Sequence, residues 1–429
     1  MPYSGNWTAV QKVIFRFVSS FLMLFILPFP FGFIPPFSLL FNYYEQLIHF
    51  LTQQVGRHIL GINQPLEKVV TGSGDQLYNW TNALTLLLLA LVIALVWTIL
   101  DRKRPAYRIL FKWFLLLVSY YLMMKMLSYG LSKVFYLQFR PLSLEQLFQN
   151  YGYSPPMRLM WTFMESSQTY TVFAGLAEVL AAGLLIFRQT RLLGGLVTFG
   201  VMFNVFLMNM SYDIPVKLSS GLYMLMGLLL VVVDYRRLLV VFAQYKGELP
   251  ETIYQPIFQG RRSRILLITF QTLLIALLTT IQVWSGINGR QRVIHRAKPA
   301  LYGVYNVTKF VKNGKEVPPL LTDTTRWKRL LIDYSKWVSV MGMDDRYQRY
   351  LVKTDTVKKQ IVFSTRKDTV NKYTMRYERM GKDLKLSGVL KKDTLNITLQ
   401  HYPLKHFDLI QRGFHWVNEE PYNGYNTLK

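Results

Sequence analysis

The chain has 429 residues, of which 51% are hydrophobic and 15% aromatic, and its formal net charge is +26. A chain of this length and composition forms either a large buried core or a bundle of membrane spans. The absence of cysteine excludes disulfides, thiolate metal sites, CxxC redox chemistry and a cysteine nucleophile. Any redox role would therefore need a bound cofactor or a quinone to carry electrons.

Seven apolar segments close to the length of a membrane span fill residues 1–288. About 20 mostly apolar residues are needed to cross a bilayer. Pro28 and Pro30 are expected to kink or end the first segment, which we interpret as a retained span because no small-residue cleavage site follows it. The predicted fold of this region is an α-helical membrane bundle of about seven transmembrane helices. The segments are Val13–Phe33, Ala83–Leu100, Ile109–Tyr129, Tyr170–Phe187, Leu192–Met210, Leu218–Val233 and Ile265–Trp284.

Basic residues concentrate in alternate connections between these segments. Loops 101–108, 188–191 and 234–264 are dense in Lys and Arg, whereas 34–79 and 131–168 carry few for their length. Under the positive-inside rule, the N-terminus is cytoplasmic and the end of the chain is outside. We therefore predict a multi-pass protein of the bacterial cytoplasmic (inner) membrane with a periplasmic C-terminal domain. The excess positive charge favours an anionic lipid bilayer as partner, and no nucleic acid is expected.

Phe37–Leu60 has helical periodicity but is a poor span. Its apolar residues recur at the spacing of an amphipathic helix that lies on the outer membrane interface. A re-entrant hairpin packed on the bundle is the alternative. The residues that interrupt its apolar character are Glu45, His49, Gln53, Gln54, Arg57 and His58.

Glu178 is the most unusual residue within the apolar segments. A charge at membrane depth costs roughly 2.5–3.5 kcal/mol on insertion scales. Small neighbours such as Gly175 and Ala181 allow a second helix to approach closely, so Glu178 is expected to face the bundle interior, either protonated or paired with a cation. The candidate partners are Lys133, Lys125 and Lys217. The arrangement is either a functional pocket or a structural ion pair.

A second polar group follows the next apolar segment. Asp213 and Lys217 can pair with each other across a short turn, or they can line the mouth of a cavity together with Asn204. The predicted intramembrane polar site therefore consists of Lys133, Glu178, Asn204, Asp213 and Lys217. The sequence identifies no catalytic residue, and the three histidines near the end of the chain lack metal-ligand spacing.

Two short motifs support a family resemblance over residues 107–234. Tyr129-Gly130-Leu131-Ser132-Lys133 and Phe173-Ala174-Gly175-Leu176-Ala177-Glu178 resemble the pattern of the DoxX family of four-helix bacterial membrane proteins. That pattern has a glycine followed three places on by lysine, and later a glycine followed three places on by glutamate. Tyr129 stands where the family often has histidine, so no catalytic role is carried over to this position.

The resemblance implies a DoxX-like four-helix core and a membrane component tied to redox or quinone metabolism. Relatives include a subunit of a thiosulfate:quinone oxidoreductase, so quinone is the implied cofactor and a redox or envelope protein the implied partner. The longer form, with three more spans and a C-terminal β domain, is similar to an arrangement found in Bacteroidetes-type bacteria.

Residues 289–429 are predicted to form an all-β, up-and-down barrel-like domain outside the membrane. Gly303-x-Tyr305, with Asp323–Trp327 as a lid or short helix, loosely resembles the lipocalin/calycin layout. Such a barrel either encloses one small apolar ligand or is packed solid. The predicted strands are Leu301–Val311, Arg329–Asp333, Trp337–Met341, Tyr347–Lys353, Lys359–Ser364, Tyr373–Arg379, Leu384–Leu390 and Thr394–Tyr402.

Three functions fit this organisation. The first is an accessory envelope protein that displays an extracytoplasmic β domain for ligand or partner binding. The alternative is the membrane subunit of a quinone-linked oxidoreductase, with Glu178 and Lys133 near the quinone headgroup. A transporter of small or lipidic molecules is the third.

Overall fold

The computed structural model describes residues 6–29, 37–67, 74–244, 253–258, 260–365 and 370–417. The chain divides into two compact units. The helical unit comprises Met1–Phe139 and Pro156–Arg290, and the β unit comprises Arg140–Pro155 and Gln291–Lys429. The β unit thus takes in a short segment from the middle of the helical sequence, which the sequence analysis did not predict.

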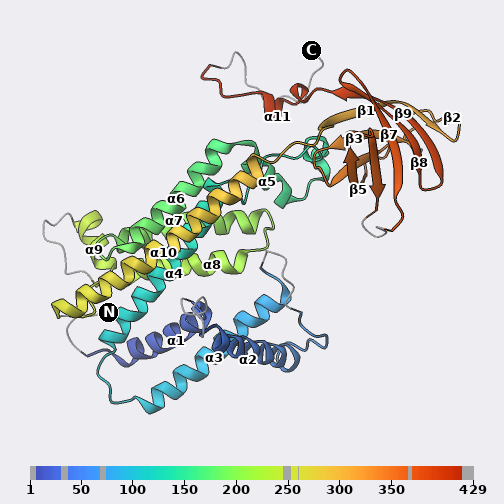
Figure 1. The fold of residues 1–429 in the computed structure, drawn as a ribbon. Helices are drawn as coiled ribbons and strands as arrows, with labels where there is room; N and C mark the ends of the chain where they lie inside the picture. The colour runs from blue at the N-terminus through green and yellow to red at the C-terminus, as the bar shows by residue number, and fades with distance from the viewer. Residues whose placement is uncertain are drawn as a thin grey trace. The chain divides into compact units, whose positions relative to one another are not determined.

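All seven predicted apolar segments form helices (Figure 1). Among the described residues, six of them are long and apolar enough to cross a membrane, while α8, at 16 residues, is shorter. The structure therefore confirms the predicted helical bundle, with six helices of spanning length and one shorter helix among the described residues. α1 ends at Ile26, just before Pro28, and residues 30–33 of the first predicted segment, Pro30 among them, lie outside the described residues. The bounds are α1 (Ala9–Ile26), α3 (Leu77–Leu100), α4 (Arg108–Val134), α6 (Gln168–Ile186), α7 (Arg191–Ser211), α8 (Lys217–Val232) and α10 (Arg261–Ile294).

The core of the helical unit is built around α4. Val118, Leu122 and Met126 on this helix are completely buried. α4 packs against α6, and α7 packs against both α6 and α8. Apolar residues recur on all sides of α4, as expected for a helix surrounded by other helices. The shorter helices of this unit are α2 (Phe37–His58), α5 (Pro156–Ser166), α9 (Tyr235–Leu239) and the π-helical turn η4 (Val240–Gln244).

The predicted amphipathic helix is present as α2, and it packs against α3. Thr52 is buried and donates from Oγ1 to Asn82 Oδ1 at 3.2 Å. Leu40, Leu47 and Phe50 are exposed on α2. The helix therefore presents apolar residues outward, as a helix in contact with lipid does. Its depth in a membrane stays a prediction.

A loop carboxylate caps the start of α8. The side chain of Asp75, which precedes α3, accepts hydrogen bonds from the backbone N–H groups of Lys217 and Leu218. The first N–H groups of a helix have no partner within the helix, and a carboxylate there also interacts favourably with the helix dipole. Asp75 thus connects the segment before α3 to the beginning of α8.

The β unit contains a closed antiparallel barrel, as predicted. From β3 to β9 each strand pairs with the next in sequence, and β1 pairs with both β3 and β9, which closes the barrel. A two-residue strand, β2 (Lys315–Glu316), follows the turn at Asn313 and Gly314, both of which have positive φ, and pairs antiparallel with the end of β1. All eight predicted strands form: β1 (Gly303–Lys312), β3 (Trp327–Ile332), β4 (Trp337–Gly342), β5 (Tyr347–Asp355), β6 (Gln360–Ser364), β7 (Tyr373–Met380), β8 (Asp383–Leu390) and β9 (Asp393–Tyr402).

Large side chains fill the barrel interior. Phe310, Trp327 and Phe363 are at most 5% exposed, and the Trp327 ring lies 6.2 Å from Phe310 and 6.5 Å from Phe363 between centroids. Leu386 and Ile397 on β8 and β9 complete the same cluster and are fully buried. An eight-stranded barrel is just wide enough for side chains to fill it, and this interior is occupied in that way.

Asp323–Trp327 is neither a helix nor part of one, contrary to one reading of the sequence. Asp323 Oδ1 accepts hydrogen bonds from the backbone N–H groups of Thr325 and Arg326, at 2.6 and 2.8 Å. An aspartate that binds the backbone two and three residues ahead forms a turn. This turn leads directly into β3, where Trp327 enters the barrel core.

The segment Arg140–Pro155, here called the α4–α5 loop, packs on the barrel within the β unit. Leu144 is 2% exposed and clusters with Val304, Leu331 and Met341. Its backbone N–H donates to Asp333 Oδ2 at 3.0 Å. The loop contains two short 3₁₀ turns, η2 (Gln146–Phe148) and η3 (Tyr151–Tyr153).

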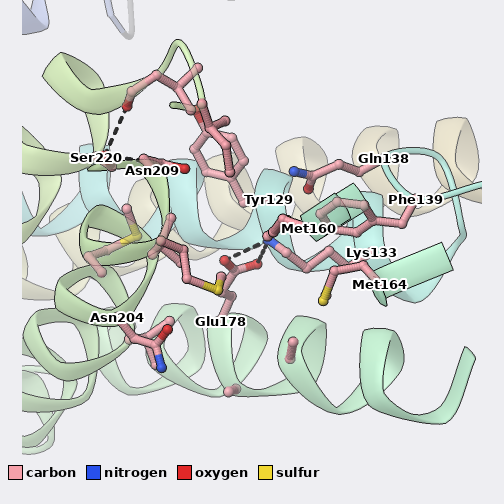
Figure 2. Close-up of a pocket in the computed structure, with 18 of the residues that line it drawn as sticks. Tyr129, Lys133, Gln138, Phe139, Met160, Met164, Glu178, Asn204, Asn209 and Ser220 are labelled. Carbon is pink, nitrogen blue, oxygen red and sulfur yellow. Dashed lines mark hydrogen bonds and ion pairs between the residues drawn. The ribbon is translucent and has the colours of Figure 1, made fainter. Parts of the chain in front are cut away.

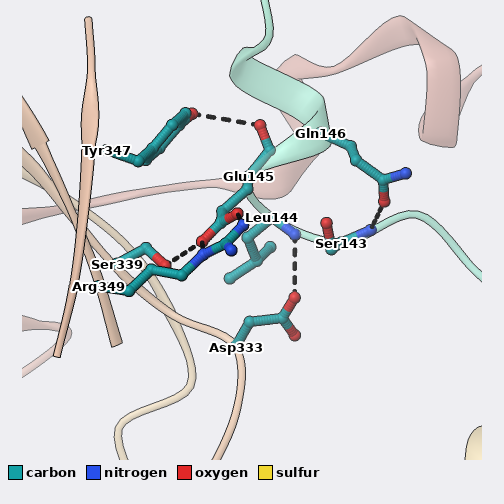
Figure 3. Close-up of polar contacts among 8 residues, drawn as sticks. All are labelled: Ser143, Leu144, Glu145, Gln146, Asp333, Ser339, Tyr347 and Arg349. Atoms are coloured by element: carbon teal, nitrogen blue, oxygen red, sulfur yellow. Dashed lines mark hydrogen bonds and ion pairs between the residues drawn. The ribbon is translucent and has the colours of Figure 1, made fainter. Parts of the chain in front are cut away.

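Glu145 supplies the polar half of this contact (Figure 3). Its carboxylate accepts hydrogen bonds from Ser339 and from Arg349, whose Nε lies 2.9 Å from Oε1. The Tyr347 hydroxyl donates to the Glu145 backbone carbonyl at 3.2 Å. Burial alone would raise the pKa of Glu145, but the hydrogen bonds from Arg349 and Ser339 and the charge of Arg349 outweigh burial and lower it.

Candidate functional site

A glycine contact brings α4 and α6 together. A Cβ atom added to Gly130 would lie 2.7 Å from the Gly175 carbonyl oxygen, and one added to Gly175 would lie 2.7 Å from the Gly130 carbonyl oxygen. Only glycine permits two backbones to approach this closely. A Cβ at Gly130 would also meet Val179, and one at Gly175 would meet Val134, so the two helices run antiparallel at this point.

The glycine contact places Lys133 beside Glu178. Helical side chains lean toward the N-terminus of their own helix, so on antiparallel helices these two side chains converge. Lys133 Nζ lies 2.7 Å from both Oε1 and Oε2 of Glu178, as Figure 2 shows. The side chains are 9% and 2% exposed. Of the predicted partners of Glu178, the structure therefore selects Lys133.

The ion pair lies in the wall of a cavity of about 310 Å³. Volumes of roughly 300–1,000 Å³ are usual for small-molecule sites. The wall is mostly aromatic and apolar, with a few polar groups spaced around it (Figure 2). The aromatic lining residues are Tyr129, Phe139, Trp161, Tyr170, Phe173 and Tyr223, and the amide side chains are Gln138, Asn204 and Asn209.

The exposed lining residues indicate where the cavity opens. Tyr170 and Phe173 on α6 are 45% and 66% exposed, and Gly200 and Asn204 on α7 are also exposed. All four belong to the apolar stretches of spanning helices. The mouth therefore lies between α6 and α7 and faces sideways, toward the surroundings of the helical unit.

The structure does not bring Asp213 and Lys217 to this cavity. Lys217 Nζ lies 2.8 Å from Asp213 Oδ1, and neither residue lines the cavity wall. Asp213 is 87% exposed, so water or headgroups can solvate it. Asp213 and Lys217 therefore pair with each other across a short turn, which is the first of the two arrangements predicted. Asn204 does line the cavity, next to its mouth.

Several lining residues were not predicted from the sequence. Asn209 Nδ2 donates to Ser220 Oγ at 2.9 Å and so joins α7 to α8 within the wall. The ring of Tyr223 packs on Tyr129 at 6.2 Å between centroids. Polar residues within apolar helices are a general signal for interior sites, and Asn209 carries that signal. Aromatic residues are so frequent in this chain that Tyr223 does not stand out.

This geometry suits a ligand with hydrogen-bond acceptors on an otherwise apolar body. The Lys133 ammonium has three donors, and Glu178 accepts two. The aromatic rings around it offer stacking surfaces for a planar group. Tyr129 also lies beneath the ammonium, with Nζ 5.8 Å from the ring centroid.

Comparison with known proteins gives a relationship by sequence. The chain is similar to the uncharacterized protein YwoB of Bacillus subtilis (strain 168), at 34% identity over 117 residues. The matched region is 27% of this chain and 73% of YwoB. No protein-family model and no solved structure matches the chain.

Proposed function

The chain belongs to the family of the uncharacterized protein YwoB of Bacillus subtilis, and we propose that it is a multi-pass envelope protein whose helical unit binds a small lipid-soluble molecule. The observation that carries this proposal is the buried Lys133–Glu178 pair in the wall of a cavity whose mouth lies between two spanning helices. A ligand dissolved in the bilayer reaches such a mouth without crossing water.

The chemistry of the wall favours a planar ring that bears carbonyl oxygens. A carbonyl accepts a hydrogen bond from the third Lys133 donor or from an amide N–H of Asn204. Aromatic rings such as Tyr129 and Phe139 suit the apolar faces of the ligand. Quinones have this structure, and the DoxX resemblance independently leads to the same class.

The second candidate function is the membrane subunit of a quinone-linked oxidoreductase. Reducing a quinone takes two electrons and two protons, and the described residues include no cysteine to pass electrons. A partner protein would supply them, while Lys133 donates a hydrogen bond to the ring oxygen. This candidate requires both a bound quinone and electron transfer, whereas the first requires binding alone.

For the β-barrel we propose an accessory role as a surface for a protein partner. Its interior is filled by Phe310, Trp327 and Phe363, which favours docking on the outer face over carrying a small ligand inside. Basic loops between the spans support a cytoplasmic N-terminus and a periplasmic barrel in the bacterial inner membrane.

Ligand binding can be tested by filling the cavity mouth without touching the ion pair. A Cβ added to Gly200 meets nothing within 4 Å, so Gly200→Phe introduces a large side chain at the mouth with little backbone strain. Gly183→Phe on α6 is the matched control, because its Cβ is equally free and Gly183 does not line the cavity. Solvent extracts of each purified protein are analysed for quinones by mass spectrometry.

We expect quinone with wild type and Gly183→Phe, and at least a tenfold lower amount with Gly200→Phe. Equal amounts in all three proteins would contradict binding in this cavity. If the whole chain binds quinone but no donor reduces it, the binding function would stand and the oxidoreductase candidate would be rejected.

A further inference from the structure

A second cavity in the helical unit, separate from the first, gathers positive charge at one end. It has a volume of about 710 Å³ and lies between the beginning of α4, the α6–α7 turn and α10. Four of its lining residues are cations and none is acidic: Lys112, Arg188, Arg191 and Arg264. Like charges gathered in one cavity repel each other unless an anion neutralises them.

Arg191 is the most unusual of these cations. It is 6% exposed, and its Nε donates to the Leu185 carbonyl oxygen at 3.5 Å. Its guanidinium lies 5.8 Å from the Tyr120 ring centroid and 5.4 Å from that of Tyr254. Among the described residues it forms no ion pair. A buried charge is normally paired, so this guanidinium lacks the anion that such a site requires.

Beyond the cations, the rest of the lining is uncharged and mostly apolar, and its polar residues on α10 are Gln271, Thr272, Thr279 and Thr280. The lining follows α10 from Arg264 to Thr280, which is about 24 Å at the rise of an α-helix. Leu267, Ile268 and Ile275 on α10 face it together with Leu115 on α4. The cavity therefore combines a cationic head region with a longer uncharged channel that is mostly apolar.

We propose that this cavity binds an anionic phospholipid. The phosphate interacts with Arg191, Arg188, Lys112 and Arg264, and one acyl chain lies along α10. Arginine suits phosphate because its planar group can donate two parallel hydrogen bonds, and basic pockets between spanning helices are typical sites for acidic headgroups. The shape and charge argue against a free phosphate ion, which would leave the apolar channel empty.

The test measures lipid retention by the full chain. Purified protein is incubated with equal amounts of phosphatidylglycerol and phosphatidylcholine of identical acyl chains, and the bound lipid is quantified by native mass spectrometry. The variant Arg188→Gln/Arg264→Gln removes two exposed cations of the cavity. Arg102→Gln/Lys103→Gln removes two exposed cations outside it and serves as the control.

Wild type and the control are expected to retain phosphatidylglycerol in preference to phosphatidylcholine. The cavity variant should bind phosphatidylglycerol about 25-fold more weakly, roughly fivefold per cation. Arg191→Gln should weaken binding as well. If this buried variant does not fold, the double variant at the exposed residues Arg188 and Arg264 still provides the test. Equal retention of the two lipids, an equal loss in the control, or displacement by millimolar inorganic phosphate would each overturn the proposal. None of these outcomes depends on whether the Lys133–Glu178 cavity binds a ligand.

Discussion

Glu178 and Lys133 show what a sequence can and cannot reveal about a single residue. A carboxylate among small apolar residues is conspicuous, and its interior position could be predicted because exposure to lipid is costly. The choice among Lys125, Lys133 and Lys217 could not be made from spacing. It depends on which lysine lies opposite Glu178 across the glycine contact, and in the structure that residue is Lys133. Lys217 instead pairs with Asp213.

Replacing one partner of the ion pair should destabilise the folded protein strongly, whereas replacing both partners should destabilise it much less. Glu178→Gln leaves the buried Lys133 ammonium without a carboxylate, and we expect a loss of about 3–5 kcal/mol in the free energy of unfolding. Lys133→Met/Glu178→Gln removes both charges and should lose clearly less. Unfolding of the purified variants in detergent, followed by tryptophan fluorescence, measures the difference. A double variant as unstable as the sum of the single variants would show that the two charges do not interact.

At the scale of helices, the contact between α4 and α6 depends on glycine. Gly175→Ala places a methyl group 2.7 Å from the Gly130 carbonyl and 2.9 Å from Lys133 Cβ, so the helices must separate. Overpacking of this kind typically costs about 1–3 kcal/mol. We expect a lower unfolding midpoint and weaker ligand binding, because the separation also displaces Lys133.

Gly183→Ala is the matched control for this prediction. Gly183 lies on the same helix, but an added Cβ meets nothing within 4 Å. Its stability should be unchanged or slightly higher, because alanine favours the helix. If both substitutions lowered the midpoint equally, the effect would come from α6 itself and not from its contact with α4.

The α4–α5 loop is held to the barrel by a titratable group. The pKa of Glu145 is lower in the folded protein than in the unfolded chain, because the hydrogen bonds from Arg349 and Ser339 outweigh burial. Its contribution to stability is therefore complete above the unfolded pKa of about 4.3. That contribution is lost as pH falls through the lower folded value.

This predicts a difference between wild type and Glu145→Gln that depends on pH. At neutral pH the variant should unfold at a lower temperature than wild type, since glutamine cannot form the charged hydrogen bonds with Arg349. As pH falls through the lowered pKa of the folded protein, the two midpoints should converge, because the wild-type carboxylate becomes protonated. Thermal unfolding of the full chain between pH 3 and 7 tests this, and a constant difference across that range would refute it.

At the scale of the whole chain, the sequence predicted a helical region and a β-barrel, but not that the α4–α5 loop belongs to the β unit. Strand periodicity located all eight barrel strands because alternation and turn residues are local signals. The docking of Leu144 and Glu145 on the barrel depends on partners about 190–200 residues away, and no local pattern encodes it. The cavity mouth likewise depends on which helices are neighbours, which hydropathy does not specify.

The division also bears on membrane topology. Because the α4–α5 loop belongs to the β unit, the loop and the barrel must lie on the same side of a membrane. The chain must then cross an even number of times between them. Of the described helices in that interval, α6, α7 and α10 are long enough to span, so we expect α8 to be the fourth crossing despite its 16 residues. We therefore expect seven spans rather than six.

The absence of cysteine makes this prediction directly testable, since every introduced thiol is the only one in the chain. Tyr153→Cys in the loop and Val357→Cys in the barrel change residues that are 86% and 90% exposed. A membrane-impermeant maleimide added to intact spheroplasts should label both, while Arg102→Cys in the basic loop should react only after lysis.

Seven spans require the thiols of Tyr153→Cys and Val357→Cys to react from the same side. Labelling of Tyr153→Cys and Val357→Cys from opposite sides would mean that α8 does not cross, and labelling of both only after lysis would keep the seven spans but reverse their orientation.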